Sequence, residues 1–182
     1  MTFYLNYKDT SYWGPIYWNI LHNLAKKVDK SSQETKNKFL YILKNFTTLI
    51  PCDDCSSTYM KTLGYAFELL SLNNVINEYY FQKLIYYLHL CVTVKKEEDT
   101  NLELFMDLIY RHKTIKEAYE ILFPTIPFIS FDIVLNLKPI DIQVFRMYYE
   151  KHMINKGDLK IYDQLILLIK QLFETKKVTS LR

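Results

Sequence analysis

Two of the three cysteines in the chain stand close together, in the stretch Pro51-Cys52-Asp53-Asp54-Cys55. Two thiols at this spacing can close a disulfide or bind one metal ion. The proline before them and the unbroken residues 56–61 after them predict a turn that opens a helix, with both cysteines in its first turn. A helix N-terminus carries partial positive charge and free N–H groups, which stabilise the reactive thiolate. The placement therefore favours redox chemistry.

The composition limits which kinds of protein carry this pair. Of the 182 residues, 49% are hydrophobic, which is enough for a proper core, and the three glycines and five prolines favour long helices over many short strands. The net charge is only +3, and the lysines are spread along the chain and form no basic cluster. No apolar run is long enough for a membrane span. We therefore expect no nucleic acid and no membrane among the partners. Residues 1–12 lack the apolar core of a secretory signal, so we expect an intracellular protein, in which such a pair serves catalysis or metal binding.

The elements that must position the cysteines are predicted to be helices, so the fold class is all-α. Apolar periodicity in the first half predicts a helix from Trp13-Gly14-Pro15 to residue 28 and a second helix opened by a capping box at residues 31–34. The cysteine helix is predicted over residues 53–63, with Gly64 as its C-cap. A short helix or turn over residues 65–72 and a long helix over residues 78–95 follow. Pro15 is expected in the first turn of its helix.

A charged run at residues 95–99 marks the expected boundary between a first domain, residues 1–98, and a C-terminal helical region, residues 99–182. Helices are predicted there over residues 102–111, 115–123, 139–152 and 159–173. About four helices in each half suggest one bundle packed on another. The second half carries no assignable motif, and we expect either a degenerate second bundle or a docking domain for client proteins.

Three motifs follow one another in the first half. Trp18, His22 and Ala25 form W-x3-H-x2-A on one helix face, Cys52 and Cys55 form C-x2-C, and Leu88-His89-Leu90-Cys91-Val92-Thr93 lies in the last long helix. Together, across residues 13–98, they resemble the Erv/ALR-type FAD-linked sulfhydryl oxidases, particularly the compact enzymes of large DNA viruses. The resemblance implies a bundle of four to five helices around FAD.

The third motif departs from the family pattern. His89 and Val92 match it, but Leu90 and Thr93 replace two asparagines, and Leu84 replaces an aromatic residue. The resemblance implies FAD contacts from Gly14, Pro15, Trp18, His22, His89 and Val92, with Tyr87, Lys95 and Lys96 as candidates for the contacts that the asparagines make in the family.

The implied activity is thiol oxidation, in which thiols and O2 give disulfides and H2O2. By the family match, Cys52 faces the substrate and Cys55 lies beside the flavin, with no metal at the site. The implied partners are thiol-bearing client proteins or a small redox relay protein, and molecular oxygen, with the enzyme as a homodimer. The implied location is the host cytoplasm or nucleus at viral assembly sites, or the virion, where the enzyme matures viral proteins.

Two alternatives remain open. The first is a zinc-binding interaction module that uses Cys52, Cys55, Cys91 and one histidine, although His89 and Cys91, two residues apart on a predicted helix, face away from each other. The second is a catalytically inactive bundle kept for assembly contacts, which the replaced asparagines favour. Taken alone, Cys91 is best explained as a small buried hydrophobe.

Overall fold

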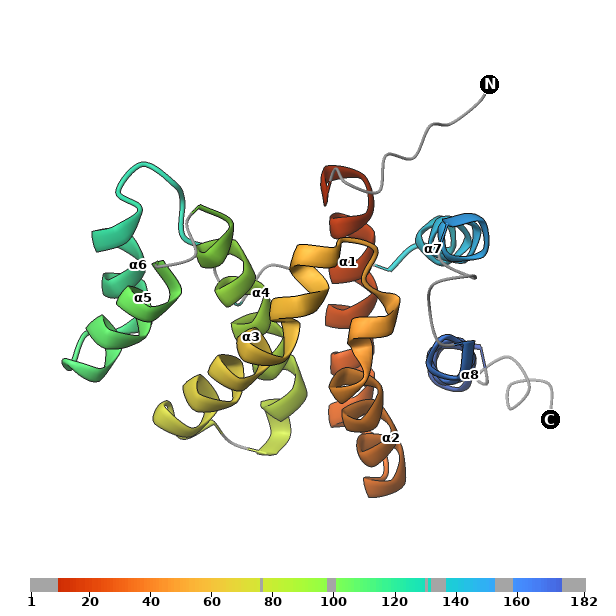
Figure 1. The fold of residues 1–182 in the computed structure, drawn as a ribbon. Helices are drawn as coiled ribbons and strands as arrows, with labels where there is room; N and C mark the ends of the chain where they lie inside the picture. Colours follow the sequence, from red (N-terminus) through yellow and green to blue (C-terminus); the bar gives the residue numbers. More distant parts are fainter. Residues whose placement is uncertain are drawn as a thin grey trace.

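The computed structural model is all-helical, as the sequence predicts. It describes residues 10–75, 77–97, 101–129, 131, 137–152 and 159–174, and these contain eight α-helices and no strand (Figure 1). The helices are α1 (Thr10–Asp29), α2 (Gln33–Lys44), α3 (Asp53–Leu72), α4 (Tyr80–Glu97), α5 (Asn101–Tyr110), α6 (Ile115–Leu122), α7 (Pro139–His152) and α8 (Leu159–Phe173), with 3-10 turns η1 (Phe46–Leu49) and η2 (Asn77–Tyr79).

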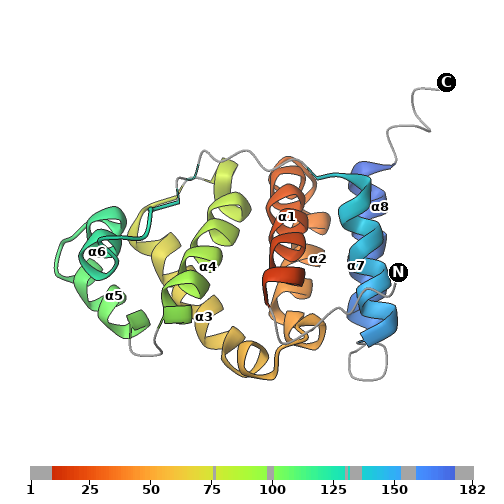
Figure 2. The same cartoon turned by 90° about the horizontal axis from the view of Figure 1, so that it is seen from above.

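The helices stand side by side in pairs along one long molecule. Seen from above (Figure 2), α5 and α6 lie at one end, α3 with α4 and α1 with α2 follow, and α7 with α8 lie at the other end. The second half of the chain therefore does not form the separate bundle suggested by the helix count. In its first pair, α5 packs on α4 and α6 packs on α5, and its last pair packs on α1 and α2. The domain boundary between residues 98 and 99 stays a prediction.

The first helix begins earlier than predicted. α1 starts at Thr10, so Pro15 lies inside the helix and not in its first turn. A proline in that position lacks the N–H of one intrahelical hydrogen bond. The apolar face of α1 is nevertheless fully packed, with Ile20, Leu24 and Val28 each at most 2% exposed. Burial of this face explains why the helix continues through the proline.

The N-terminus of α2 is capped one residue later than predicted. Ser32 is the N-cap, and its Oγ accepts the backbone N–H of Thr35 at 3.3 Å. Glu34 lies in the first turn and forms an exposed ion pair with Lys38 at 3.6 Å. The predicted capping box over residues 31–34 is therefore wrong, because residue N3 is a threonine.

The cysteine helix is longer than predicted. α3 runs without a break from Asp53 to Leu72, and Gly64 lies in its interior with no positive φ. Gly64 therefore is not a C-cap, and residues 65–72 are not a separate element. The helix ends where predicted, at Asn73 and Asn74, and Asn74 has a φ of 47°. Asparagine adopts this left-handed conformation more readily than most residues.

The start of α4 is fixed by a carboxylate from the end of α1. Asp29 is 7% exposed, and its two oxygens accept the backbone N–H groups of Phe81 and Gln82 at 2.8 and 3.0 Å. The Gln82 side-chain Nε2 donates a third hydrogen bond to Asp29 at 3.1 Å. Because the first N–H groups of a helix have no partner within it, Asp29 serves as a cap supplied by a distant segment. It locks α1 and α4 in register.

The four helices predicted in the second half are present. α7 and α8 have the predicted bounds, α5 begins and ends one residue earlier than predicted, and α6 ends one residue earlier. None of the helices in the described ranges has both the length and the apolar character needed to cross a membrane.

Candidate functional site

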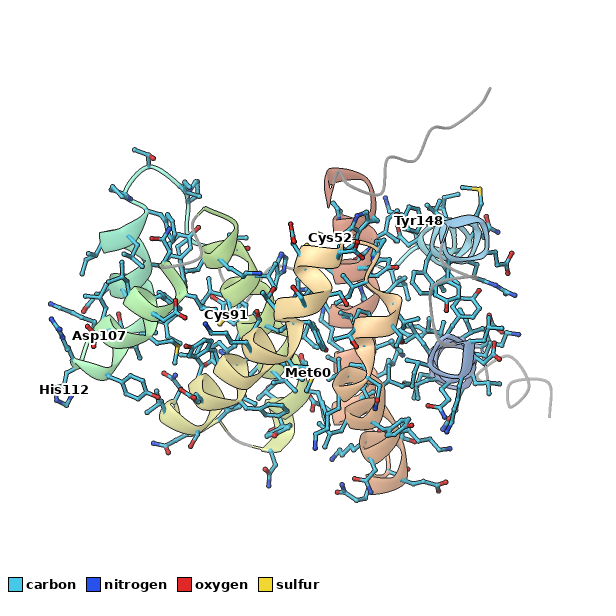
Figure 3. The ribbon with its side chains drawn as sticks, viewed as in Figure 1. Cys52, Met60, Cys91, Asp107, His112 and Tyr148 are labelled. Atoms are coloured by element: carbon cyan, nitrogen blue, oxygen red, sulfur yellow. The ribbon has the colours of Figure 1, made fainter. Side chains whose placement is uncertain are left out.

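The cysteine pair lies at the N-terminus of α3, as predicted. Cys52 is the N-cap residue in an extended conformation, and its Sγ accepts the backbone N–H of Cys55 at 3.2 Å. Both cysteines are partly exposed thiols. Figure 3 labels Cys52 at the beginning of α3. A sulfur in the N-cap position takes the place that a serine or aspartate oxygen usually fills, so Cys52 lies at the positive end of the helix.

Three rings converge from α1 and α4. The Trp18 indole lies flat on the His89 imidazole, with centroids 4.1 Å apart and planes 8° from parallel. His22 Nε2 and His89 Nδ1 lie 3.0 Å apart, at hydrogen-bond distance. All three side chains are partly exposed. Residues about 70 positions apart in sequence thus form one aromatic cluster, which we call the ring cluster (Trp18, His22 and His89).

The hydrogen bond between the two imidazoles requires that one nitrogen donates and the other accepts. Burial, with the neighbouring His89 and Lys26, lowers the pKa of His22 to about 3. His22 is therefore neutral near pH 7 and carries one N–H. A neutral imidazole among rings suits an uncharged aromatic ligand better than an anion.

The far end of α4 contacts α3 one turn beyond the cysteines. Lys95 Nζ contacts the Thr58 hydroxyl, and Thr58 Oγ1 in turn donates to the Asp54 carbonyl at 3.0 Å. Val92, one turn before Lys95, is partly exposed on α4. The sequence analysis missed Thr58, although its position three residues after Cys55 places it on the same helix face. The Lys96 side chain lies outside the described side chains.

The structure does not bring every predicted contact to the ring cluster. Tyr87 is only 4% exposed and lies two residues before His89, which turns it to another side of α4. Gly14 is buried and Pro15 is exposed in the first half of α1. Their roles in ligand binding stay predictions, and that of Tyr87 has no geometric support.

The replaced asparagine positions have structural explanations. Leu90 is 3% exposed and belongs to the core, and the Thr93 hydroxyl donates to the His89 carbonyl of its own helix at 3.0 Å. Leu84 is also fully buried. On α4, the Lys95 side chain contacts the cysteine helix through Thr58.

Cys91 is chemically separate from the cysteine pair. It is fully buried in α4, and burial, with a contribution from Glu68, raises the pKa of its thiol to about 12. The interpretation of Cys91 as a small buried hydrophobe is confirmed. Within the described part of the chain, no three His, Cys, Asp or Glu side chains converge in a way that holds a metal ion.

The gathered side chains fit a flavin in part. The flat rings and the neutral imidazole come from α1 and α4, and the thiol pair begins α3, which packs on α4; these are the kinds of group that a redox-active aromatic cofactor needs. The 4.1 Å spacing between Trp18 and His89 leaves no room for a third ring, so an aromatic ligand meets the outer faces of this stack unless the rings separate. The residues that would hold FAD are the ring cluster, Val92 and Lys95.

Comparison with protein-family models, with curated proteins and with solved structures finds no match to this chain. The case for a function consequently depends on the cysteine pair, the ring cluster and the motifs that contain them.

Proposed function

We propose that the chain is a thiol oxidase that forms disulfide bonds in client proteins through Cys52 and Cys55. The observation that carries the proposal is the convergence of Trp18, His22 and His89, from two helices far apart in sequence, beside a helix that begins with a thiol pair. Taken singly, a core tryptophan or a hydrogen-bonded histidine is unremarkable. A stacked and hydrogen-bonded trio in a chain with C-x2-C supports a cofactor wall.

The reaction transfers two electrons from each pair of client thiols. A client dithiol and the Cys52–Cys55 disulfide exchange to give a client disulfide and two enzyme thiols. When bound, FAD supplies the route by which these electrons reach O2, which becomes H2O2. The sum is two thiols and O2 giving one disulfide and H2O2.

The chain's own residues divide the exchange steps. A client thiolate attacks Cys52, and Cys55 leaves as a thiolate, since the resemblance to the sulfhydryl oxidases implies that Cys55 lies on the flavin side. The N-terminus of α3 stabilises negative charge on sulfur in this region. A second client thiolate then attacks the client sulfur of the mixed disulfide, which releases the client disulfide with Cys52 as the leaving thiolate. No second C-x2-C is present, so a client or a small relay protein must reach Cys52 directly.

The role that we propose for the ring cluster is to bind and orient the cofactor. A neutral His22 presents one ring nitrogen to His89, which fixes both imidazole planes. Lys95 adds a positive charge at the contact between α4 and α3. A homodimer that acts at viral assembly sites remains part of the proposal.

The test is the absorbance and turnover of the purified full chain. We expect a yellow protein with a flavin band near ~450 nm that consumes oxygen when given a dithiol. Trp18→Ala and His22→Ala should lose flavin on gel filtration, whereas Tyr41→Ala, an exposed aromatic on α2, should retain it. A colourless protein that cannot be loaded with FAD would refute the proposal.

A catalytically inactive helical interaction module is the second candidate. The direct stack of Trp18 on His89 and the burial of Leu90 favour it, because both reduce what is available to a nucleotide. In that case the purified chain is colourless and free of metal. A colourless protein that carries zinc would instead indicate the metal-binding module.

A further inference from the structure

The segment that leads into Cys52 is held from both sides by side-chain hydrogen bonds. The Tyr17 hydroxyl of α1 donates to the Leu49 carbonyl at 2.6 Å, and this bond is buried. The Ser56 hydroxyl of α3 donates to the Thr47 carbonyl at 2.9 Å. Leu49 lies three residues before Cys52. Tyr17 therefore fixes the backbone from which the first cysteine projects.

Tyr17 is itself held by the second half of the chain. Its ring, 4% exposed, meets the Phe145 ring of α7 edge-on at 5.1 Å, and it meets Phe46 of η1 at 6.0 Å. Burial, together with the neighbouring Tyr148 and Tyr149 of α7, raises the pKa of Tyr17 well above its usual value. The hydroxyl thus keeps its proton and remains a donor throughout the physiological range.

The same segment is also covered directly. α8 packs on η1, while α7 packs on α1 beside it. Figure 3 labels Tyr148 on α7 and Cys52 at the start of α3. The contacts lead from Phe145 through Tyr17 to Leu49, and the backbone continues from Leu49 over three residues to Cys52.

We propose that α7 is a positioning element for the cysteine pair and that Tyr17 is the positioning residue through which it acts. This inference deepens the proposed function, because it gives the C-terminal helices a role at the same pair. Tyr17 touches neither sulfur. It restricts the segment before Cys52, so that the two sulfurs need little further ordering before they reach bonding distance.

The test is the equilibrium between the cysteine pair and glutathione, followed by thiol labelling of the full chain. One oxidised glutathione and the two thiols give the Cys52–Cys55 disulfide and two reduced glutathiones. Tyr17→Phe keeps the ring but removes the hydroxyl. In the reduced chain the segment before Cys52 is then freed, whereas in the oxidised chain the Cys52–Cys55 disulfide still restricts it. We expect the equilibrium constant for closure to fall about fivefold, as for loss of one typical hydrogen bond. This equals about 20 mV for a two-electron couple.

Tyr86→Phe is the matched control. The Tyr86 hydroxyl also donates to a backbone carbonyl at 2.6 Å, but to Ile129, on the other flank of the molecule. Tyr86→Phe should lower thermal stability as Tyr17→Phe does, and it should leave the equilibrium constant for disulfide closure within about twofold of the wild-type value. Phe145→Leu, which alters only the α7 side of the contact, should reproduce the Tyr17→Phe shift.

Three results would overturn the inference: an unchanged equilibrium in Tyr17→Phe, an unchanged equilibrium in Phe145→Leu, or an equal fall in Tyr86→Phe. The measurement needs no flavin and no oxygen. A pair that closes normally in a colourless, inactive protein therefore refutes the proposed oxidase alone. A wild-type pair that forms no disulfide with glutathione refutes both proposals.

Discussion

At the scale of single residues, burial separates the three cysteines into two chemical kinds. Cys91 is enclosed in the core with its pKa raised to about 12, so it keeps its proton near pH 7. Cys52 and Cys55 are partly exposed at a helix N-terminus. Only a thiolate attacks a disulfide, which leaves the C-x2-C pair as the nucleophiles of the described chain.

The two cysteines of the pair should give different spectra when each is replaced. If the chain is the proposed oxidase, Cys52→Ser leaves Cys55 as a thiolate beside oxidised flavin, so a long-wavelength charge-transfer band is expected, whereas Cys55→Ser should lack it. Both variants should lose turnover. Cys91→Ala is the control and should keep turnover with reduced stability, since it only removes a buried sulfur. The band in Cys55→Ser would mean that the two roles are reversed.

His22 should make stability depend on pH. Its pKa is about 3 in the folded chain and 6.5 ordinarily, so between these values the unfolded chain binds more protons. Stability is therefore complete above pH 6.5 and falls as the pH drops, by roughly 1–2 kcal/mol between pH 7 and 5. Urea unfolding at both pH values measures this loss. His22→Gln should flatten the dependence, whereas His112→Gln, at an exposed turn, should not; equal slopes in all three proteins would exclude His22 as the cause.

At the scale of helices, the cysteine helix owes its length to packing on α4 and not to local sequence. Gly64 lies in the middle of α3, where glycine weakens a helix. The space around it is open, with no atom within 4 Å of a built Cβ. No close approach explains the glycine, and nothing else in the described structure accounts for it.

Gly64→Ala should consequently stabilise the chain. Alanine loses less backbone entropy on folding and fits the helical conformation here, so the gain should be about 0.5–1 kcal/mol. The urea midpoint should rise with an unchanged slope. Ala66→Gly, made at a fully buried position two residues away, should lower the midpoint. A destabilised Gly64→Ala would contradict the open space around Gly64.

The fold was predictable wherever one helix buries one face. The bounds of α7 and α8 follow from apolar periodicity alone, and so does the placement of the cysteines in the first turn of α3. Gly64 and Pro15 misled the prediction because both are usual helix boundaries, and here long-range packing outweighs their local cost. Ser32 was missed as the cap because its neighbour Ser31, with Glu34 three residues later, fits the capping-box pattern and Ser32 does not.

Contacts between distant segments could not be predicted. The ring cluster was expected from its motifs, but the stack of Trp18 on His89 and the bond between His22 and His89 depend on how α1 and α4 cross. The Lys95 contact to Thr58 depends likewise on the packing of α4 on α3. Spacing in the sequence shows which residues share one face of a helix. It does not show how a neighbouring helix is rotated about its own axis, and so which of its side chains meet that face.

Asp29 is a long-range contact whose contribution to stability can be measured. It accepts two backbone N–H groups from the first turn of α4, 52 and 53 residues away in sequence. Asp29→Ala should leave these donors buried without an acceptor and cost about 1–3 kcal/mol, measured by urea unfolding. Asp29→Asn, which retains an acceptor oxygen, should lose less. An equal loss in both variants would mean that charge, not hydrogen bonding, is what α4 requires.

At the scale of the whole molecule, the second half of the chain covers both flanks of the first. α5 packs on α4 at one end, and α7 and α8 pack on α1, α2 and η1 at the other (Figures 1 and 2). α1 thus has α4 on one side and α7 on the other. α1, which carries Trp18 and His22, therefore lies between other helices, although it is the first helix in the described residues.

Removal of the second half should therefore prevent folding of the first. α8 alone buries six side chains, Ile161, Tyr162, Leu165, Ile166, Leu168 and Ile169. Their exposure, with that of the faces they cover, forfeits on the order of 10 kcal/mol of apolar burial before chain entropy offsets part of it. That is comparable to the whole stability of an ordinary domain. A chain of residues 1–99 should aggregate or melt without cooperativity.

A chain of residues 1–131 separates the two flanks, because it retains α5 and α6 but lacks α7 and α8. If the C-terminal pair is the cover for α1 and η1, this chain should also bind a dye for exposed apolar surface and lose its cooperative melting transition, as followed by circular dichroism. A monomeric, cooperatively melting chain of residues 1–99 would show that residues 10–97 fold alone, and one of residues 1–131 would show that the fold does not need α7 and α8. The contacts of α7 and α8 would then serve the cysteine pair without holding the fold together.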